Sequence, residues 1–271
     1  MQSNNQLFYT PKATFLTDKS ILFGLTNYSL SALSSNGEFN FEKILDSYSQ
    51  SFSTMEWNTD PQHLIEESVL HHLLNSDITS IFIRMECNAN IFRENGVIFS
   101  DHWTQFITSL SEYSSVKKNM ILSFDRNTHY SKELLESFLT LREEIIPIEL
   151  FFECDHHSWK NPSALKIIRG GKIKVVQRDI PDLAGFNFHI ANPDKKECYL
   201  RLLGRNKVNW FSTEKKIRYQ YDYTKAELEQ IISKINSLRM SYEKIYVIGC
   251  NSPSHSAISN VRQLSKLYQL D

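Results

Sequence analysis

The sequence ECYLRLLGRNKVNWFSTEKKIRYQYDY, residues 197–223, joins an apolar run to a long cationic and aromatic segment. The run 199–203 is interrupted only by Arg201, a pattern typical of a parallel strand that is covered on both faces. The segment from Leu203 to Thr224 is too long for a simple connection between a strand and a helix, so we expect it to be functional or locally structured. Its mixture of arginine, lysine and aromatic side chains indicates a rim that can bind an anion.

The same unit, a short apolar run followed by a helical pattern, recurs along the chain. Strands are predicted over residues 21–24, 54–57, 81–85, 120–124, 148–153, 173–177, 199–203 and 245–250, and helices over 41–52, 102–113, 132–144, 225–238 and 256–267. Thr224 and Glu227 fit a capping box at the start of one of these helices. Eight strands alternating with helices predict a single-domain TIM-like (β/α)8 barrel over residues 21–271, with residues 1–20 as an N-terminal extension.

A doubly wound open sheet is the alternative α/β architecture. Such a sheet usually carries a glycine-rich first turn that binds a nucleotide phosphate. Here the first predicted strand leads into Gly24-Leu25-Thr26-Asn27-Tyr28, and the chain has only 8 glycines. The sequence therefore favours the barrel and argues against a phosphate loop of that kind.

Composition predicts a cytoplasmic protein with no membrane partner. No apolar run is long enough to span a bilayer, and the first residues lack the pattern of a secretory signal. The four cysteines, Cys87, Cys154, Cys198 and Cys250, are far apart and lie in or beside predicted strands, where a small buried side chain is their usual role. The sequence does not indicate an oligomeric state.

Charge is distributed unevenly between the two halves of the chain. Residues 1–147 hold 10 Lys and Arg against 18 Asp and Glu, whereas residues 148–271 hold 20 against 13. A basic C-terminal half favours an anionic small molecule or nucleic acid as ligand. The alternative is that solvent-exposed helix faces simply differ in charge between the two halves, which gives the same numbers of acidic and basic residues without a ligand.

Polar residues follow most of the predicted strands, at the barrel end where TIM-like enzymes place their active sites. They are Glu56, Asn58, Arg84, Glu86, Asp125, Arg126, Glu153, Asp155, His156, His157, Trp159, Arg178, Asp179, Arg201, Arg205 and Asn251. Three hypotheses account for them. In the first, Glu56, Glu153, His156 and Asp179 bind a divalent metal, although no local spacing of histidines supports this.

In the second hypothesis, Arg201 and Arg205 bind a phosphate or carboxylate, and Glu153 or Asp179 acts as a base or orienting group. In the third, the carboxylates and Arg201 neutralise one another in a structural network across the barrel mouth. The aromatic residues of 210–223 also have two interpretations. They stack on bases or sugars, or they pack against one another over the barrel.

Several segments, in order along the chain, resemble domain-of-unknown-function family 72 (DUF72), whose members include the YecE-like proteins. In the N-terminal part, Gly24 matches the family's opening glycine, and residues 48–58 are similar to Y-x-x-x-F-x-x-V-E-x-N. In the middle, residues 153–159 (ECDHHSW) are similar to E-F-R-H-x-S-W, residues 178–181 to the D-x-P element, and residues 199–205 (YLRLLGR) to Y-x-R-x-H-G-R. Toward the C-terminus, residues 219–223 are similar to Y-x-Y, residues 245–251 to Y-V-x-F-N-N, and Ala257 and Asn260 to A-x-x-N-A. The resemblance implies a TIM-like barrel without an established activity. Likeness of such barrels to metal-dependent endonucleases and sugar isomerases suggests a phosphate or nucleic-acid ligand by analogy.

The chain departs from the family pattern at three polar positions. Asp155 stands in place of an arginine, Leu203 in place of a histidine and Cys250 in place of an asparagine. The retained residues define the candidate site: Glu153, His156 and Asp179 as catalytic candidates, and Glu56, Asn58, Trp159, Arg201, Arg205 and Asn251 as ligand-binding candidates. A divalent metal is the one cofactor that these residue types suggest. The sequence thus predicts a barrel that binds or hydrolyses an anionic ligand, or a degenerate, non-enzymatic binding protein on the same fold.

Overall fold

A computed structural model describes residues 20–33, 40–60, 63–87, 101–112, 116–170, 173–183, 195–251 and 255–270. Apart from Ser20, the expected N-terminal extension lies outside these residues.

The described strands form one parallel sheet in the order β6-β5-β4-β3-β2-β1-β9-β8-β7. They are β1 (Ile21–Thr26), β2 (Thr54–Thr59), β3 (Ser80–Cys87), β4 (Lys117–Phe124), β5 (Glu149–Cys154), β6 (Lys174–Val175), β7 (Gln177–Asp179), β8 (Glu197–Leu202) and β9 (Lys244–Gly249). Only Val176 separates β6 from β7, so these two short strands are the halves of one barrel strand. The first half pairs with β5 and the second with β8, which brings the two edges of the sheet together.

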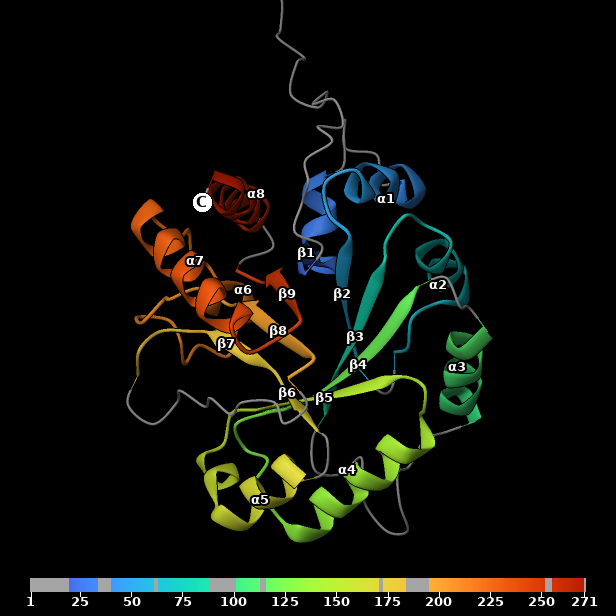
Figure 1. The fold of residues 1–271 in the computed structure, drawn as a ribbon. Helices are drawn as coiled ribbons and strands as arrows, with labels where there is room; N and C mark the ends of the chain where they lie inside the picture. Colours follow the sequence, from blue (N-terminus) through green and yellow to red (C-terminus); the bar gives the residue numbers. More distant parts are fainter. Residues whose placement is uncertain are drawn as a thin grey trace, which may run out of the picture.

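Helices surround this barrel (Figure 1). They are η1 (Asn27–Leu33), α1 (Phe41–Ser49), α2 (Glu67–Leu74), α3 (Asp101–Glu112), α4 (Lys132–Glu144), η3 (His157–Lys160), α5 (Pro162–Gly170), α6 (Lys215–Arg218), α7 (Lys225–Arg239) and α8 (His255–Leu270). The predicted barrel is confirmed, and the open doubly wound alternative is wrong because the strand order closes on itself. Every predicted strand and helix has a counterpart, including the capping box of Thr224 and Glu227.

Apolar side chains fill both the inside of the barrel and the layer between strands and helices. The inside is packed by Phe82, Ile121, Phe151, Val176, Tyr199, Tyr246 and Ile248. Two larger clusters lie outside the sheet, one under α1 to α5 and one under α7. Because aromatic rings close the middle of the barrel, a ligand site inside it must lie toward one of the two ends.

Gly24 allows β1 and β2 to approach closely where β2 begins. A Cβ atom at residue 24 would lie 2.1 Å from the carbonyl oxygen of Thr54, a distance that no side chain tolerates. The four cysteines are free thiols, three of them buried and Cys250 half-buried. In the described part of the chain, no helix has the length and apolar character needed to cross a membrane.

The long loop between β8 and α7 has its own internal structure, as expected. Gly204 opens it with φ 85°, a left-handed conformation that favours glycine. Asn206 then holds its two sides together: the side-chain amide donates to the carbonyl oxygens of Ile217 (3.3 Å) and Gln220 (3.0 Å). We call residues 204–223 the cap loop.

Candidate functional site

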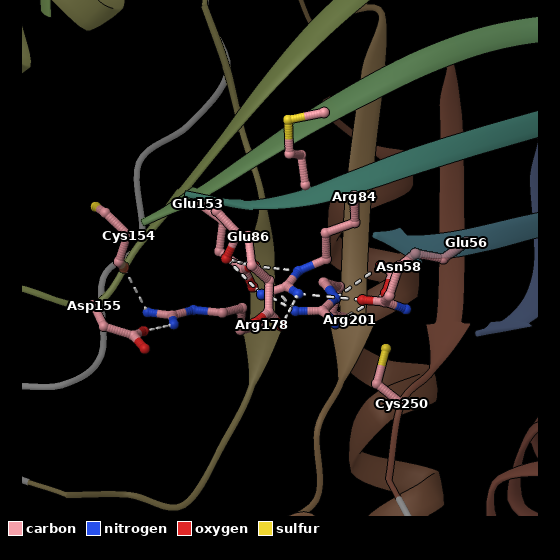
Figure 2. Close-up of polar contacts among 12 residues, drawn as sticks. Glu56, Asn58, Arg84, Glu86, Glu153, Cys154, Asp155, Arg178, Arg201 and Cys250 are labelled. Carbon is pink, nitrogen blue, oxygen red and sulfur yellow. Dashed lines mark hydrogen bonds and ion pairs between the residues drawn. The ribbon is translucent and has the colours of Figure 1, made fainter. Parts of the chain in front are cut away.

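Strand alternation selects the side chains that enter the barrel. Successive residues of a strand point to opposite faces, so residues two apart share a face. Phe82 and Tyr199 belong to the aromatic layer inside the barrel, and Arg84 and Arg201 therefore lie one step closer to the mouth on the same face. Glu56 and Glu153 meet these arginines from β2 and β5 (Figure 2).

Arg201 is the centre of this buried network. Its Nε and Nη2 donate to the two carboxylate oxygens of Glu56 at 2.8 and 2.9 Å, and its Nη1 donates to Glu153 Oε1 at 2.7 Å. The Tyr199 hydroxyl donates a further bond of 2.8 Å to Glu56. Glu56 is 0% and Arg201 4% exposed, so the ion pairs are formed out of contact with bulk water.

Arg84 extends the network toward the rim. Its Nε donates to Glu153 Oε2 at 2.8 Å, and its Nη1 donates to Glu86 Oε1 at 2.8 Å and to Asn58 Oδ1 at 3.2 Å. Ser123 donates to the same carboxylate, Glu153, at 2.7 Å. Glu153 is thus shared by two guanidinium groups and one hydroxyl.

This environment keeps Glu153 ionised. Burial raises the pKa of its carboxyl, but the nearby Arg201 and Arg84 guanidinium groups outweigh burial and hold the pKa well below the usual range. At neutral pH Glu153 is therefore an anion. It can accept a proton or orient a partner, but it has no proton to donate.

Asp179 and Arg205 form a second network outside the barrel wall. Arg205 binds both carboxylate oxygens of Asp179, at 2.8 and 2.9 Å, and the Tyr223 hydroxyl donates to Asp179 at 3.0 Å. Asp179 is paired in register with Leu202, a member of the cluster under α7, and so shares its outward face. Arg205 and Arg201, which the sequence suggested as joint anion ligands, are therefore in separate networks.

Arg178 has the opposite side-chain direction from Asp179 and reaches the mouth of the barrel. It forms an ion pair with Asp155, and its Nη2 donates to the carbonyl oxygen of Cys154 at 3.1 Å. Figure 2 shows this pair beside the Arg201 network, with Asp155 just beyond the end of β5. Asp155 is one of the three departures from the family pattern.

His156 and Trp159 have local structural partners. His156 Nδ1 accepts the backbone N–H of Ser158 at 3.2 Å, which makes this side chain the cap of η3. Burial and the neighbouring His129 and His157 rings lower the pKa of His156. Trp159 is 0% exposed and its Nε1 donates to the carbonyl oxygen of Thr128 at 3.0 Å.

The two candidate asparagines hold the loops at the mouth. Asn58 donates through its backbone N–H and its side-chain amide to Asn27 Oδ1, at 3.1 and 3.2 Å. Asn251 is 0% exposed and donates to the carbonyl oxygen of Tyr221 at 2.9 Å and to Asn260 Oδ1 at 2.7 Å. It thereby ties the end of the cap loop to α8.

A small pocket lies above the Arg201 network, with about 30 Å³ of free space. Arginines and aromatic side chains of the cap loop dominate its walls. The lining residues are Arg84, Ser123, Arg126, Glu153, Asp155, Arg178, Arg201, Leu203, Trp210, Phe211, Arg218 and Tyr219. Five of these are arginines and only two are carboxylates. The pocket is therefore electropositive, and its space accommodates a few water molecules or a small anionic group.

Of the predicted site residues, the structure brings Glu153 and Arg201 to this pocket. Glu56 lies behind them, while Asp179, Arg205, His156, Trp159 and Asn251 belong to other contacts. The four proposed metal ligands do not converge, because Arg201 lies between Glu56 and Glu153, and Asp179 and His156 have separate partners. Among the described residues, no group of three His, Cys, Asp or Glu side chains is arranged to hold a metal ion.

The sequence places Arg84, Arg126 and Arg178 at strand ends without indicating that they belong to the site, and it does not indicate Arg218 as a pocket residue. The alternation of inward-pointing residues along a strand could have indicated two of them. Phe82 and Val176 belong to the interior cluster, and Arg84 and Arg178 lie two residues after them on the same strand faces. The position of Arg218 over the pocket follows from the path of the cap loop, which no local pattern encodes.

Comparison with known proteins places these features in a family. Residues 23–271 match the family model described as "Protein of unknown function DUF72". A curated relative, the UPF0759 protein YunF of Bacillus subtilis, is 26% identical over 83 residues. That match spans only 29% of this chain and 29% of YunF.

Solved structures of DUF72 family proteins share the fold. One from Thermotoga maritima superposes with a TM-score of 0.73 at 21% identity, covering 91% of this chain and 98% of that one. One from Enterococcus faecalis gives 0.73 at 17% identity, covering 93% and 96%. At these identities, the likeness supports the barrel architecture and not a particular activity.

Proposed function

The chain belongs to the DUF72 family of proteins of unknown function, and from that premise we propose that the arginine-lined pocket at its barrel mouth binds an anionic ligand of phosphate or nucleic-acid type. The observation that carries this proposal is the excess of arginine over carboxylate in the pocket wall. Guanidinium groups present paired N–H donors that match phosphate and carboxylate oxygens.

The arginines of the pocket are suited to different tasks. Arg84 and Arg201 already hold buried carboxylates, so they contribute positive potential and rigidity to the floor. Arg126 is exposed, and within the described residues it has no hydrogen-bond or ion-pair partner. Arg218 donates, among the described residues, to the backbone oxygen of Ser212 alone, at 2.9 and 2.6 Å. Arg126 and Arg218 are therefore the groups best able to accept a new anion.

The arrangement supports binding of the anion without catalysis better than it supports hydrolysis of the anion. Glu153 is the one catalytic candidate that borders the pocket, and its oxygens are engaged by Arg84, Arg201 and Ser123. A hydrolytic version requires Glu153 to accept a proton from an attacking water, and thus to loosen one of these bonds. The proposed catalytic roles of His156 and Asp179 have no support in their contacts.

Isothermal titration calorimetry with inorganic phosphate, a nucleoside monophosphate and a short single-stranded oligonucleotide tests this proposal. We expect binding of at least one ligand, and a loss of about tenfold or more in affinity when Arg126→Ala removes a charge-assisted contact. Arg169→Ala is the matched control, because Arg169 is exposed in the last turn of α5 and does not line the pocket. No binding of any of the three ligands would remove the proposal.

Salt dependence separates the two kinds of ligand. If the pocket takes one phosphate of a free metabolite, the affinity falls modestly with salt concentration. If the cap loop tracks a nucleic-acid backbone, several phosphates are neutralised and the oligonucleotide affinity falls steeply with salt. The aromatic side chains of the loop would then add base stacking, which Phe211→Ala should weaken.

We also propose that the protein acts in the cytoplasm, which its free and mostly buried cysteines support. Cell fractionation followed by immunodetection tests this location. Recovery of the chain from an extracellular fraction would contradict it.

A further inference from the structure

We propose that Asp155 sets the anion affinity of the pocket by occupying Arg178, so that its carboxylate competes with the ligand for that guanidinium group. This inference rests on the proposed anion-binding function and identifies a specificity-determining residue within it. Asp155 and Arg178 both line the pocket, and they form an ion pair with one another there.

Asp155 differs from the buried carboxylates Glu56 and Glu153 in its freedom to move. The side chains of Glu56 and Glu153 are 0% and 4% exposed, and Arg201 holds both. The side chain of Asp155 is 36% exposed, and Arg178 is its one ion-pair partner in the described part of the chain. Asp155 also lies just after Cys154, the last residue of β5, and so outside the strand's hydrogen-bond ladder.

Arg178, by contrast, is fixed in place. Its side chain is 6% exposed, and the carbonyl oxygen of Cys154 holds its Nη2 at 3.1 Å. The group that can leave the pair is therefore Asp155, and the vacated Nη1 donor remains in the pocket wall (Figure 2). An oxyanion that enters the pocket can take the place of the Asp155 carboxylate on Arg178.

Charge gives Asp155 a second effect on the same ligand. A carboxylate in the wall of a small pocket repels any anion that enters it, and water screens that repulsion only partly at this depth. Without Asp155, Glu153 would be the one carboxylate among the residues that line the pocket, against five arginines. Asp155 thus both blocks one donor and reduces the positive potential that attracts the ligand.

Asp155→Asn tests this inference, with inorganic phosphate as the probe. The substitution keeps the size of the side chain and removes its charge. We expect phosphate to bind the variant about tenfold or more tightly than the wild-type chain in calorimetry. Asp46→Asn, on the exposed face of α1, makes the same change in net charge away from the pocket and should leave the affinity unchanged.

Thermal unfolding distinguishes competition from a structural role. Without phosphate, Asp155→Asn should unfold at a lower temperature than the wild-type chain, because Arg178 loses a partner in a buried position. With phosphate in excess, the variant should gain more stability than the wild-type chain gains. If Asp155 has a purely structural role, the variant should unfold at a lower temperature without phosphate, but phosphate should not stabilise it more than it stabilises the wild-type chain.

The outcomes separate this inference from the proposed function. If the wild-type chain and Asp155→Asn bind phosphate equally, the inference is wrong and the anion site stands. If neither binds phosphate, the inference is wrong, and the anion site fails with it only if the nucleoside monophosphate and the oligonucleotide do not bind either. Competition for Arg178 is supported if Asp155→Asn binds phosphate more tightly than the wild-type chain and the Asp155→Asn/Arg178→Met double variant does not. If the double variant keeps the higher affinity of Asp155→Asn, the inference is overturned.

Discussion

At the scale of single residues, Arg201 shows why a charged side chain tolerates burial in this barrel. The guanidinium group satisfies two carboxylates, and Tyr199 satisfies one of them further. Desolvating these charges is costly, and the short, well-oriented contacts offset that cost. Removing only the cation leaves an uncompensated carboxylate in the core.

We therefore expect Arg201→Met to lower the free energy of unfolding by about 3–5 kcal/mol. Glu153 keeps Arg84 in this variant, whereas Glu56 keeps only the Tyr199 hydroxyl among the contacts described above. Adding Glu56→Gln to Arg201→Met should then recover part of the loss, because the orphaned charge disappears. Urea unfolding at neutral pH measures both variants. A loss below about 1 kcal/mol for Arg201→Met would show that the network does not support the fold.

The sequence identified Arg201 as an unusual residue, since an arginine in an apolar strand requires a partner. It offered the strand-end carboxylates as possible partners but did not single out Glu56 and Glu153, which are 145 and 48 residues away along the chain. The choice between Glu56, Glu153 and a bound anion depends on which strands meet across the barrel.

At the scale of elements, the cap loop covers the pocket from β8. Its helix α6 reaches across the mouth, where Lys215 forms an ion pair with Glu86 at the end of β3. Trp210, Phe211, Arg218 and Tyr219 of the same loop line the pocket below. One exposed ion pair therefore joins this side of the loop to the opposite wall.

Lys215→Gln should increase hydrogen exchange in the cap loop while changing global stability by less than about 1 kcal/mol, because the pair is partly exposed. Hydrogen–deuterium exchange with mass spectrometry measures peptides of residues 204–220. Lys216→Gln is the matched control, since no ion pair is described for Lys216 on the same helix. Equal exchange in the two variants would mean that Lys215 does not hold the loop.

At the scale of the whole molecule, ion pairs lie at both ends of the barrel with the aromatic layer between them. Glu197, at the start of β8, pairs with Lys117 and Lys174 and accepts a bond of 3.0 Å from the Tyr246 hydroxyl. Burial raises the pKa of Glu197, but hydrogen bonds from Lys117 and Lys174 outweigh it and lower the pKa to about 2. Glu153 at the other end also has a lowered pKa.

These depressed values predict instability in acid. A carboxyl whose pKa is lower in the folded state adds stability above its unfolded pKa, about 4.3 for Glu, and this stability is lost as the pH falls through the folded value. The melting temperature should therefore decline between about pH 5 and pH 2. The Glu197→Gln variant should have a lower melting temperature than the wild-type chain at pH 7, and its melting temperature should decline less steeply over that range. Glu143→Gln is the control: its side chain is exposed, so its melting temperature should follow the wild-type curve. Parallel curves for Glu197→Gln and the wild-type chain would contradict this account.

Local patterns of the sequence suffice to predict the barrel, because parallel strands covered on both faces and amphipathic helices leave periodic patterns that need no knowledge of distant contacts. The sequence also indicates the family and the structured loop after β8. The tertiary structure alone shows which polar residues lie together at the pocket. It separated Arg205 and Asp179 from Arg201, buried Trp159, made His156 a helix cap and added Arg126, Arg178 and Arg218 to the pocket. The physical reason is that barrel closure and the path of the cap loop set these neighbours, and both depend on contacts between residues far apart in the chain.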